Sequence, residues 1–400
     1  MSLSNDQLLV LAARLGTPLY TYDLARVRSA AALLRTELPA DARVFYSLKA
    51  NPHPGIVAAC LAEGLGVEVS SEGEWSSIPD GTPATSVIYS GPGKTRGQLT
   101  DFAKRWDGYV TVESFRELAE VRAVGGFAGI LLRVNITSAH TGASLTMSGR
   151  PSQFGIDDAD LMSAWSTHDL GAGDVVGFQV YAMSNQTDVR ILAATAGEAL
   201  QFVREMTRRF GFRPAIVDLG GGFPAPFGRP GVLGLAGLRA ALLTELAAAP
   251  TDAQLVFESG RFLSATAGSL YARVLDVKSS KGREYVVLDA GVNCVAGLQA
   301  SGRTLPVPVG IEVVHRCSQA GRQRPMTVTG PLCTPFDVLN REILLDVMPG
   351  DLVRVPNVGA YGLSASAVGF LSRRLPAEVV VDGAKVIGAT RVTMVRGGCG

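Results

Sequence analysis

Several features are scarce in this 400-residue chain, and each scarcity excludes a class of protein. The five cysteines are odd in number, widely spaced and without paired metal-ligand spacing, so we expect reduced thiols in a cytoplasmic protein. No apolar run approaches membrane-spanning length, and the polar N-terminal residues do not resemble an export signal. The four histidines share no ligand spacing, so the sequence assigns no metal.

An excess of charge of either sign is also missing. The 37 basic and 36 acidic residues leave a formal charge of +1, which provides no overall field to recruit nucleic acid or an anionic membrane. We therefore expect a small-molecule substrate. Hydrophobic residues make up 47% of the chain, which is enough for a large core, excludes disordered and fibrous classes, and at this length favours two domains.

Short β-branched or aromatic runs alternate with segments of helical spacing between about residues 40 and 260. Eight strands alternating with helices over this length predict a closed (β/α)8 barrel of the TIM type rather than an open sheet. The predicted strands are residues 44–48, 67–69, 87–89, 109–112, 130–134, 175–180, 215–219 and 255–257.

The pattern changes after residue 261, where strands with intervening turns and little helix are predicted. They cover residues 269–279, 284–290, 326–329 and 351–355, and a β-rich stretch over 376–396. A further strand over residues 18–22 would exceed the barrel's eight, so we assign it to the second domain. The prediction is an α/β protein with a barrel over residues 26–264 and an all-β domain built from residues 1–25 and 265–400.

A glycine triplet and an arginine follow the last two predicted barrel strands. Gly220, Gly221 and Gly222 come after the seventh strand and Arg261 after the eighth, which is where barrels commonly hold phosphate. Glycines let backbone N–H groups converge on an anion, and an arginine adds paired donors. A tight turn and a surface ion pair would explain each feature alone, but their matching placement favours a phosphate site.

Lys49 ends the first predicted barrel strand, where its amine can form a Schiff base with an aldehyde cofactor. Glu258 lies at the end of the eighth strand. A carboxylate against a pyridine nitrogen keeps that nitrogen protonated, so the ring can accept electrons. A solvated lysine and a capping glutamate are the alternatives. Together with the phosphate site, the two residues predict bound pyridoxal 5′-phosphate.

Two residues of the predicted second domain are further candidates. Cys333 lies in a Gly-Pro-flanked loop, where a thiol could protonate a carbanion; an inert, half-buried cysteine is the alternative. Tyr361 lies between glycines and could donate its hydroxyl to phosphate, or it could pack as a loop aromatic.

Eight short motifs carry a resemblance that extends from about residue 18 to residue 371. They are residues 46–51, 66–69, 132–135, 153–156, 219–223, 258–261, 330–337 and 359–362. In combination they resemble the fold-type III (alanine-racemase-like) pyridoxal-phosphate decarboxylases, the group containing diaminopimelate and ornithine decarboxylases.

This resemblance implies catalytic roles for Lys49, Glu258 and Cys333. It also implies an obligate head-to-tail homodimer, in which the loop with Cys333 enters the partner's active site. The cofactor contacts that it implies, besides Lys49 and Glu258, come from Glu68, Arg133, Ser184, Gly221, Gly222, Gly260, Arg261 and Tyr361.

Two positions depart from the family pattern. Tyr181 stands where the family usually stacks a histidine on the cofactor ring, and it can still cover that ring. Thr334 stands where diaminopimelate and ornithine decarboxylases carry an acid that grips a distal ammonium. Burying an ammonium without a counter-charge is costly, so a simple diamino acid is a poor substrate prediction. Asp337 is available as an acid but matches a different position.

Residues 90–95, 143–156, 257–263 and 332–335 resemble, more closely, the decarboxylases of the staphyloferrin B, achromobactin and vibrioferrin siderophore pathways. This likeness implies an amino acid already joined to citrate, such as citryl-serine or citryl-diaminopropionate. Arg150 and Arg316 are candidate partners for citryl carboxylates, although either could be a solvated arginine. Thr334 and Asp337 complete the candidate substrate contacts.

Other functions remain open at this point. A decarboxylase of an aminoacyl group tethered to a carrier protein shares the threonine after the cysteine, and diaminopimelate is a further alternative. A racemase would use the same lysine and phosphate site, but Glu258 at the ring nitrogen argues for decarboxylation. A non-enzymatic cofactor-binding protein of this barrel type would lack the second domain.

Overall fold

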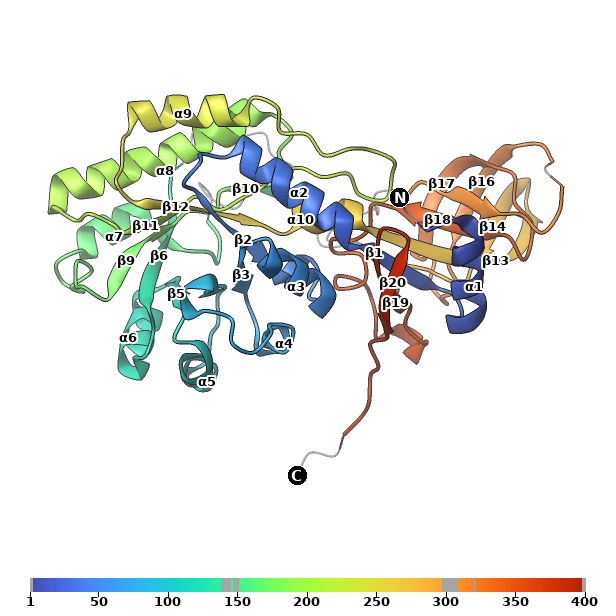
Figure 1. Cartoon of the computed structure of the whole chain (residues 1–400), viewed down its shortest axis with the longest axis horizontal. Coiled ribbons are helices and arrows are strands. Elements are labelled where there is room, and N and C mark those ends of the chain that lie inside the picture. Colours follow the sequence, from blue (N-terminus) through green and yellow to red (C-terminus); the bar gives the residue numbers. More distant parts are fainter. Residues whose placement is uncertain (1–2, 138–144, 147–150, 297–307, 320, 398–400) are drawn as a thin grey trace. The chain divides into compact units, whose positions relative to one another are not determined.

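The computed structural model describes residues 3–137, 145–146, 151–296, 308–319 and 321–397 (Figure 1). The chain divides into two compact units. One comprises Arg28–Pro224 and Gly234–Phe262, and the other comprises Met1–Val27, Ala225–Leu233 and Leu263–Gly400. The short segment Ala225–Leu233, which lies inside the sequence range predicted for the barrel, is thus grouped with the second unit.

The first unit is a closed parallel barrel (Figure 1). Its strands are hydrogen-bonded in the order β5–β4–β3–β2–β12–β11–β9–β6, and pairing of β6 with β5 closes the ring. All eight strands were predicted to within two residues at each end, so the predicted (β/α)8 fold is confirmed. The strands are β2 (Arg43–Ser47), β3 (Gly66–Val69), β4 (Val87–Tyr89), β5 (Tyr109–Val112), β6 (Gly129–Asn135), β9 (Val175–Gln179), β11 (Ile216–Asp218) and β12 (Gln254–Ser259).

Helices follow most of these strands, and local sequence explains where they begin and end. Helix α8 (Val189–Phe210) begins after the N-cap Asp188 and ends at Gly211, whose φ of +68° suits glycine. Helix α5 (Arg96–Trp106) begins with a capping box formed by Thr95 and Gln98. The others are α2 (Leu24–Glu37), which runs from the second unit into the first, α3 (Pro54–Ala62), α4 (Glu72–Trp75), α6 (Phe115–Val124), α7 (Asp158–Ala164), α9 (Leu238–Ala248) and α10 (Arg261–Ser264).

Apolar residues from five different strands form a buried cluster in the barrel: Phe45, Ile88, Leu131, Ile216 and Val256. Residues of a strand point alternately to the two faces of a closed sheet, so these five side chains pack together on one face. The residues at the strand ends can then face the C-terminal edge of the barrel. Two short pairings lie outside the ring: β8 (Ile156–Asp157) with β6, and β10 (Met183–Ser184) with β7 (Leu145–Thr146).

The second unit is built on a nine-stranded mixed sheet. The N-terminal strand β1 (Leu19–Asp23) lies between β13 and β19, antiparallel to the first and parallel to the second. The remaining strands are β13 (Gly268–Ser280), β14 (Arg283–Leu288), β15 (Glu312–His315), β16 (Arg324–Thr329), β17 (Val338–Leu345), β18 (Leu352–Pro356), β19 (Ala377–Asp382) and β20 (Lys385–Thr390).

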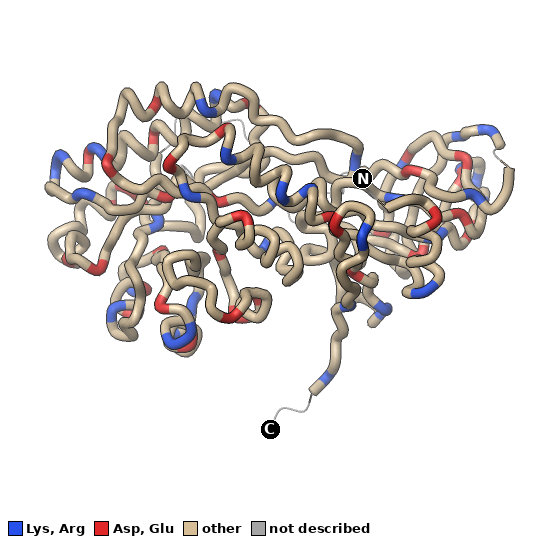
Figure 2. The backbone as a smooth tube through the Cα atoms, viewed as in Figure 1, with Lys and Arg blue, Asp and Glu red and all other residues tan. Residues whose placement is uncertain are grey.

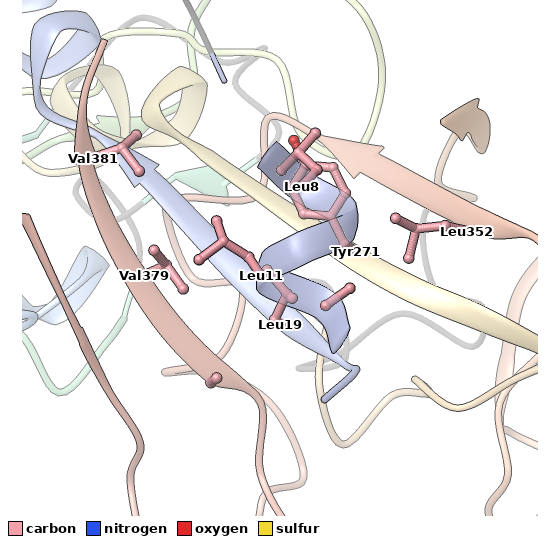
Figure 3. Close-up of a cluster of buried hydrophobic side chains, with 9 residues drawn as sticks. Leu8, Leu11, Leu19, Tyr271, Leu352, Val379 and Val381 are labelled. Atoms are coloured by element: carbon pink, nitrogen blue, oxygen red, sulfur yellow. The ribbon is translucent and has the colours of Figure 1, made fainter. Parts of the chain in front are cut away.

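Helix α1 (Asn5–Leu15), which the sequence analysis did not assign, covers part of this sheet. A capping box of Ser4 and Gln7 starts it. Its Leu8 and Leu11 pack with Leu19 and with side chains of three other strands (Figure 3). Burying two leucines contributes roughly 3 to 6 kcal/mol, because each fully buried apolar side chain is worth about 1.5 to 3 kcal/mol.

Positively and negatively charged residues are interspersed along both units (Figure 2), in keeping with the formal charge of +1. Among the described residues, no helix combines the length and the apolar character that crossing a membrane requires. Within the same residues, no group of three or more histidine, cysteine or acidic side chains is placed to hold a metal ion.

Candidate active site

The C-terminal ends of β2 and β3 bring a lysine and a buried carboxylate together. Lys49 lies in the single 3-10 turn (Leu48–Ala50) that follows β2, and its Nζ is 3.0 Å from Oε2 of Glu68 on β3. Burial works to raise the pKa of the Glu68 carboxyl. The charge of Lys49 and hydrogen bonds from Lys49, Ser47 and Ser70 outweigh that effect, so the pKa lies below its usual value. Glu68 is therefore an anion at neutral pH and holds the amine in place.

Three side chains meet at the ends of the neighbouring strands β9, β11 and β12. Gln179 lies opposite Asp218 in the β9–β11 register, and Glu258 lies near the end of β12. The Nε2 group of Gln179 is 2.5 Å from Oε1 of Glu258 and 3.4 Å from Oδ2 of Asp218. All three residues are buried, at 2% exposure or less. They form a buried polar cluster.

Burial raises the pKa of both acids in this cluster. The pKa of Asp218 rises to about 6, mainly because the charged form loses hydration. Burial raises the pKa of Glu258 well above its usual range, and the charges of Asp218 and Glu68 add to the effect. Two carboxyl groups this close cannot both ionise at low cost, so the pair retains a proton near neutral pH.

The glycine triplet after β11 packs against the same strands so tightly that side chains are excluded. A Cβ atom at Gly221 would lie 1.8 Å from the carbonyl oxygen of Glu258. Gly222 has φ +90°, and a Cβ there would lie 2.6 Å from the carbonyl oxygen of Met183. The backbone therefore approaches as only glycine allows, which suits a turn whose N–H groups receive an anion.

Tyr181 follows β9 and lies against both the lysine and this turn. The centre of its ring is 5.7 Å from Nζ of Lys49, within the range of a cation–π contact. A Cβ atom at Gly220 would lie 2.8 Å from its Cδ2 atom. The structure thus brings Lys49, Tyr181 and the glycine triplet together.

The other residues predicted around the cofactor are divided between the two units. Arg261 begins α10 directly after β12, Gly260 precedes it, and Ser184 ends β10. Tyr361 is half-buried in the second unit, with φ +57°. Arg133, on β6, is 3.0 Å from Glu113 Oε1, so in this structure its charge is paired within the barrel.

The loop with Cys333 is organised by Asp337. The buried Asp337 carboxylate accepts hydrogen bonds from the backbone N–H groups of Val292 (2.8 Å) and Leu332 (2.7 Å). Cys333 and Thr334 are carried between these anchor points, and the thiol-bearing residue is exposed. Asp337 therefore shapes the loop, and its two oxygens are bound to backbone groups rather than directed to a ligand.

The two arginines proposed to bind substrate differ in what the structure shows. Nη1 of Arg316 is 3.0 Å from Asp346 Oδ2 and 2.6 Å from the carbonyl oxygen of the same residue. Its charge is therefore already paired. Arg150 lies outside the described residues.

Sequence reasoning missed Gln179 and Asp218 as partners of Glu258. A signal was present, because Asp218 directly ends a barrel strand two residues before the glycine triplet and Gln179 ends another strand. Parallel strands place their ends at one edge, so these polar residues could have been grouped with Glu258. Ser259 was missed as well: its buried Oγ has no hydrogen-bond partner within the described part of the chain.

A (β/α)8 barrel with a lysine, buried acids and a glycine turn at its C-terminal edge defines a class of barrel enzymes that bind an aldehyde cofactor. The chain belongs to the pyridoxal-dependent decarboxylases: residues 24–265 match the family described as "Pyridoxal-dependent decarboxylase, pyridoxal binding domain". The protein is thus a pyridoxal-phosphate-dependent amino acid decarboxylase of fold type III.

Three relatives illustrate the range of this family. The chain is 30% identical to the L-glutamyl-[BtrI acyl-carrier protein] decarboxylase of Niallia circulans, over 95% of this chain and 92% of the relative. It is 28% identical to the 2-[(L-alanin-3-ylcarbamoyl)methyl]-2-hydroxybutanedioate decarboxylase of Staphylococcus aureus, over 89% and 92%. It is also 28% identical to the diaminopimelate decarboxylase of Zymomonas mobilis, over 94% and 90%. These values give only weak support to the predicted closeness to siderophore enzymes.

A solved structure shows the same fold. The diaminopimelate decarboxylase of Helicobacter pylori, complexed with L-lysine, superimposes with a TM-score of 0.83 at 22% identity, covering 96% of each chain. The barrel and the β-rich unit therefore form a known combination.

The described residues fit pyridoxal phosphate. The glycine turn offers backbone N–H groups where a Cβ would collide, and buried acids lie at the barrel's C-terminal edge. The buried Oγ of Ser259 and Oε1 of Gln179 have no protein partner among the described residues, so polar valences remain for a ligand.

Proposed function

We propose that this decarboxylase removes the α-carboxylate of an amino acid whose distal end is joined to another group, such as a carrier protein or citrate, rather than being a free ammonium. The observation that carries the proposal is the loop at residues 330–337, whose one acid, Asp337, is bound to the N–H groups of Val292 and Leu332. Thr334, next to Cys333, is neutral. Burying an ammonium against this loop would leave it without a counter-charge, which costs several kcal/mol.

A carrier-protein-tethered aminoacyl group is the first candidate for such a substrate. The relative from Niallia circulans acts on a glutamyl group attached to a carrier protein. In addition, Arg316, proposed to bind distal carboxylates, already forms an ion pair with Asp346. A tethered, uncharged distal end needs no arginine.

A citrate-linked amino acid, such as citryl-serine or citryl-diaminopropionate, is the second candidate. The name of the Staphylococcus aureus relative describes an amide between an amino acid side chain and a hydroxy-dicarboxylate. Arg150 would be the carboxylate partner in this case, because an arginine can hold a carboxylate through two charge-assisted hydrogen bonds. Both candidates share a distal end without an ammonium.

Under this proposal, the predicted site residues supply the cofactor's surroundings. Lys49 would hold the cofactor through its ε-amino group, and Gly221, Gly222, Ser184, Arg261 and Tyr361 would surround the phosphate. When bound, pyridoxal phosphate supplies a ring that takes up the electron pair released as the bond to the carboxylate breaks. Glu258 would hold a proton at the ring nitrogen.

Two further residues, Tyr181 and Cys333, would exclude water and deliver a proton. Tyr181 would cover one face of the ring, and its contact with Lys49 fits that position. Cys333, exposed in its own chain, would enter the active site of the partner subunit in a head-to-tail homodimer and return a proton to the α-carbon.

The test is carbon dioxide release, with pyridoxal phosphate present, from a glutamyl carrier protein, citryl-serine, citryl-diaminopropionate, and free ornithine, lysine and diaminopimelate. We expect one of the conjugates to have the highest kcat/KM. A Thr334→Glu variant is the matched probe, because an added acid should raise kcat/KM for free diamino acids relative to conjugates. Faster turnover of a free diamino acid by the unmodified protein would refute the proposal.

A further inference from the structure

Asp218 connects two parts of the proposed cofactor site. Its Oδ1 accepts the N–H group of Gly220 at 2.9 Å, at the start of the glycine triplet. Its Oδ2 faces Gln179 Nε2 at 3.4 Å, and Gln179 is also 2.5 Å from Glu258. Asp218 is fully buried. One carboxylate therefore links the phosphate turn to the acid proposed to face the ring nitrogen.

The environment of the two acids decides which one carries the shared proton. Asp218 accepts a backbone N–H, which favours its charged form, and it also pairs with Glu258 through a side-chain hydrogen bond. This shared hydrogen bond lowers the pKa of Asp218 and raises the pKa of Glu258, as expected when Asp218 is the acceptor and Glu258 the donor. Two other charged groups face the pair. The negative charge of Glu68 raises the pKa of Glu258, and the positive charge of Lys49 lowers it. The proton therefore resides on Glu258.

Gln179 is suited to either protonation state of Glu258. Its NH2 group can donate to a carboxylate, and a half-turn of the same amide presents its carbonyl oxygen to a carboxylic acid. In the structure, the Nε2 group faces Glu258, and Oε1 has no hydrogen-bond partner among the described residues. An amide at this place keeps Glu258 oriented whether or not the proton has moved.

We propose that Asp218 is a positioning residue that keeps a proton at Glu258 through its buried negative charge, while Gln179 orients Glu258 in both protonation states. The inference rests on the proposed place of Glu258 at the ring nitrogen. With the cofactor bound, Glu258 would share this proton with the ring nitrogen, so that no other proton transfer is needed. The negative charge of Asp218 then resists loss of that proton as the pH rises.

The first experiment uses the full chain without cofactor, so that it does not depend on the activity. Infrared spectroscopy in H2O and D2O should show a protonated, buried carboxyl at neutral pH, and Glu258→Gln should remove it. In Asp218→Asn, which keeps an oxygen for the Gly220 N–H, the band should disappear at least 1 pH unit lower than in the unmodified chain. An unchanged titration in Asp218→Asn, or no band that depends on Glu258, would overturn the proposal.

Two further variants keep the test decisive. If Asp218→Asn does not fold, Asp218→Ser replaces it, because a hydroxyl can also accept the N–H two residues on. In Gln179→Leu, Glu258 should still lose its proton only at high pH. Its carboxyl band should move to higher frequency, because a hydrogen bond to the carboxyl group is lost. An unmoved band would remove the role of Gln179.

The cofactor-loaded protein gives an independent readout. The NMR signal of the isotopically labelled ring nitrogen should lose its protonated form at lower pH in Asp218→Asn than in the unmodified chain, and no shift would contradict the role. If the infrared results hold but Glu258→Gln decarboxylates normally, the proton arrangement stands and the proposed role of Glu258 in the reaction fails. The two failures are therefore distinguishable.

Discussion

Nζ of Lys49 lies 3.0 Å from Oε2 of Glu68, yet the lysine side chain is 40% exposed and the glutamate side chain only 1%. The amine thus stands on the solvent side of a fixed, buried anion. An incoming aldehyde can reach it without displacing Glu68, whose remaining hydrogen bonds come from the protein. This arrangement orients a nucleophile while leaving it accessible.

Lys49 should carry the cofactor covalently. Borohydride reduction of the loaded protein, followed by peptide mass spectrometry, should place the cofactor on Lys49. Lys49→Ala should lose covalent attachment and decarboxylate at least about 100-fold more slowly, because the positioned amine is missing. Lys104→Ala, at an exposed site on α5, is the control. Trapping on a different lysine would show that the assignment is wrong.

Glu258→Gln should retain cofactor binding but lower kcat by about 100- to 1000-fold, the range for losing one preorganised electrostatic contact that strengthens in the transition state. Single-turnover kinetics and absorbance titration with pyridoxal phosphate separate the two effects. Glu205→Gln, which removes an acid paired with Arg208 on the barrel surface, should change neither. Near-normal kcat in Glu258→Gln would exclude the role.

Mixing two inactive chains tests the shared active site. Lys49→Ala and Cys333→Ala subunits that exchange at random should restore about a quarter of the sites, because half of the dimers are mixed and each holds one intact site. The measurement is decarboxylation after exchange, with heterodimers quantified by mass spectrometry. Cys333→Ala must be inactive alone. No recovery in the presence of heterodimers would mean that each site is built from one chain.

Lys94 is predicted to be a stability determinant. Its Nζ is 2.9 Å from Glu117 Oε1, with only 2% and 7% of the two side chains exposed, and burial lowers the pKa of the lysine. Lys94→Met should cost about 3 to 5 kcal/mol in the free energy of unfolding, because Glu117 is left as a buried, unpaired charge. Chemical denaturation measures this cost, and adding Glu117→Gln should recover much of it. Equal stabilities of Lys94→Met and Lys104→Met would contradict the prediction.

The stability of the cofactor-free protein should fall with rising pH through the titration of Asp218. Its folded pKa of about 6 exceeds the ordinary unfolded value of about 3.9, so the folded state binds the proton more tightly. The stabilisation is complete below the unfolded pKa and is lost as the pH rises through about 6. In Asp218→Asn this pH-dependent loss of stability should disappear. The denaturant concentration at the unfolding midpoint should therefore vary less between about pH 4 and about pH 7 than in the unmodified chain. An identical pH profile would show that Asp218 does not titrate there.

Local pattern was sufficient to predict the barrel and to place several candidate residues at the ends of its strands. The strands at residues 87–89 and 109–112 agree with the structure to the residue, because a parallel strand buried on both faces is a short β-branched run bounded by turn residues. Lys49, Glu258 and the glycine triplet could be grouped for a related reason: all follow barrel strands, and parallel strands end at one edge.

Other features depended on contacts between residues far apart in sequence. The pairing of Gln179, Asp218 and Glu258 requires three strands in one register, and the buried position that raises both acid pKa values exists only after the barrel closes. Asp337 could be identified as an acid near Cys333, but only the folded loop shows that its oxygens are bound to backbone N–H groups. Sequence pattern by itself determined the strands and the chemistry available at their ends, because periodicity and turn residues are local. Tertiary structure alone decided that the pKa values of Asp218 and Glu258 are raised and that Asp337 is bound to backbone N–H groups, because desolvation and hydrogen bonding arise only when distant segments pack together.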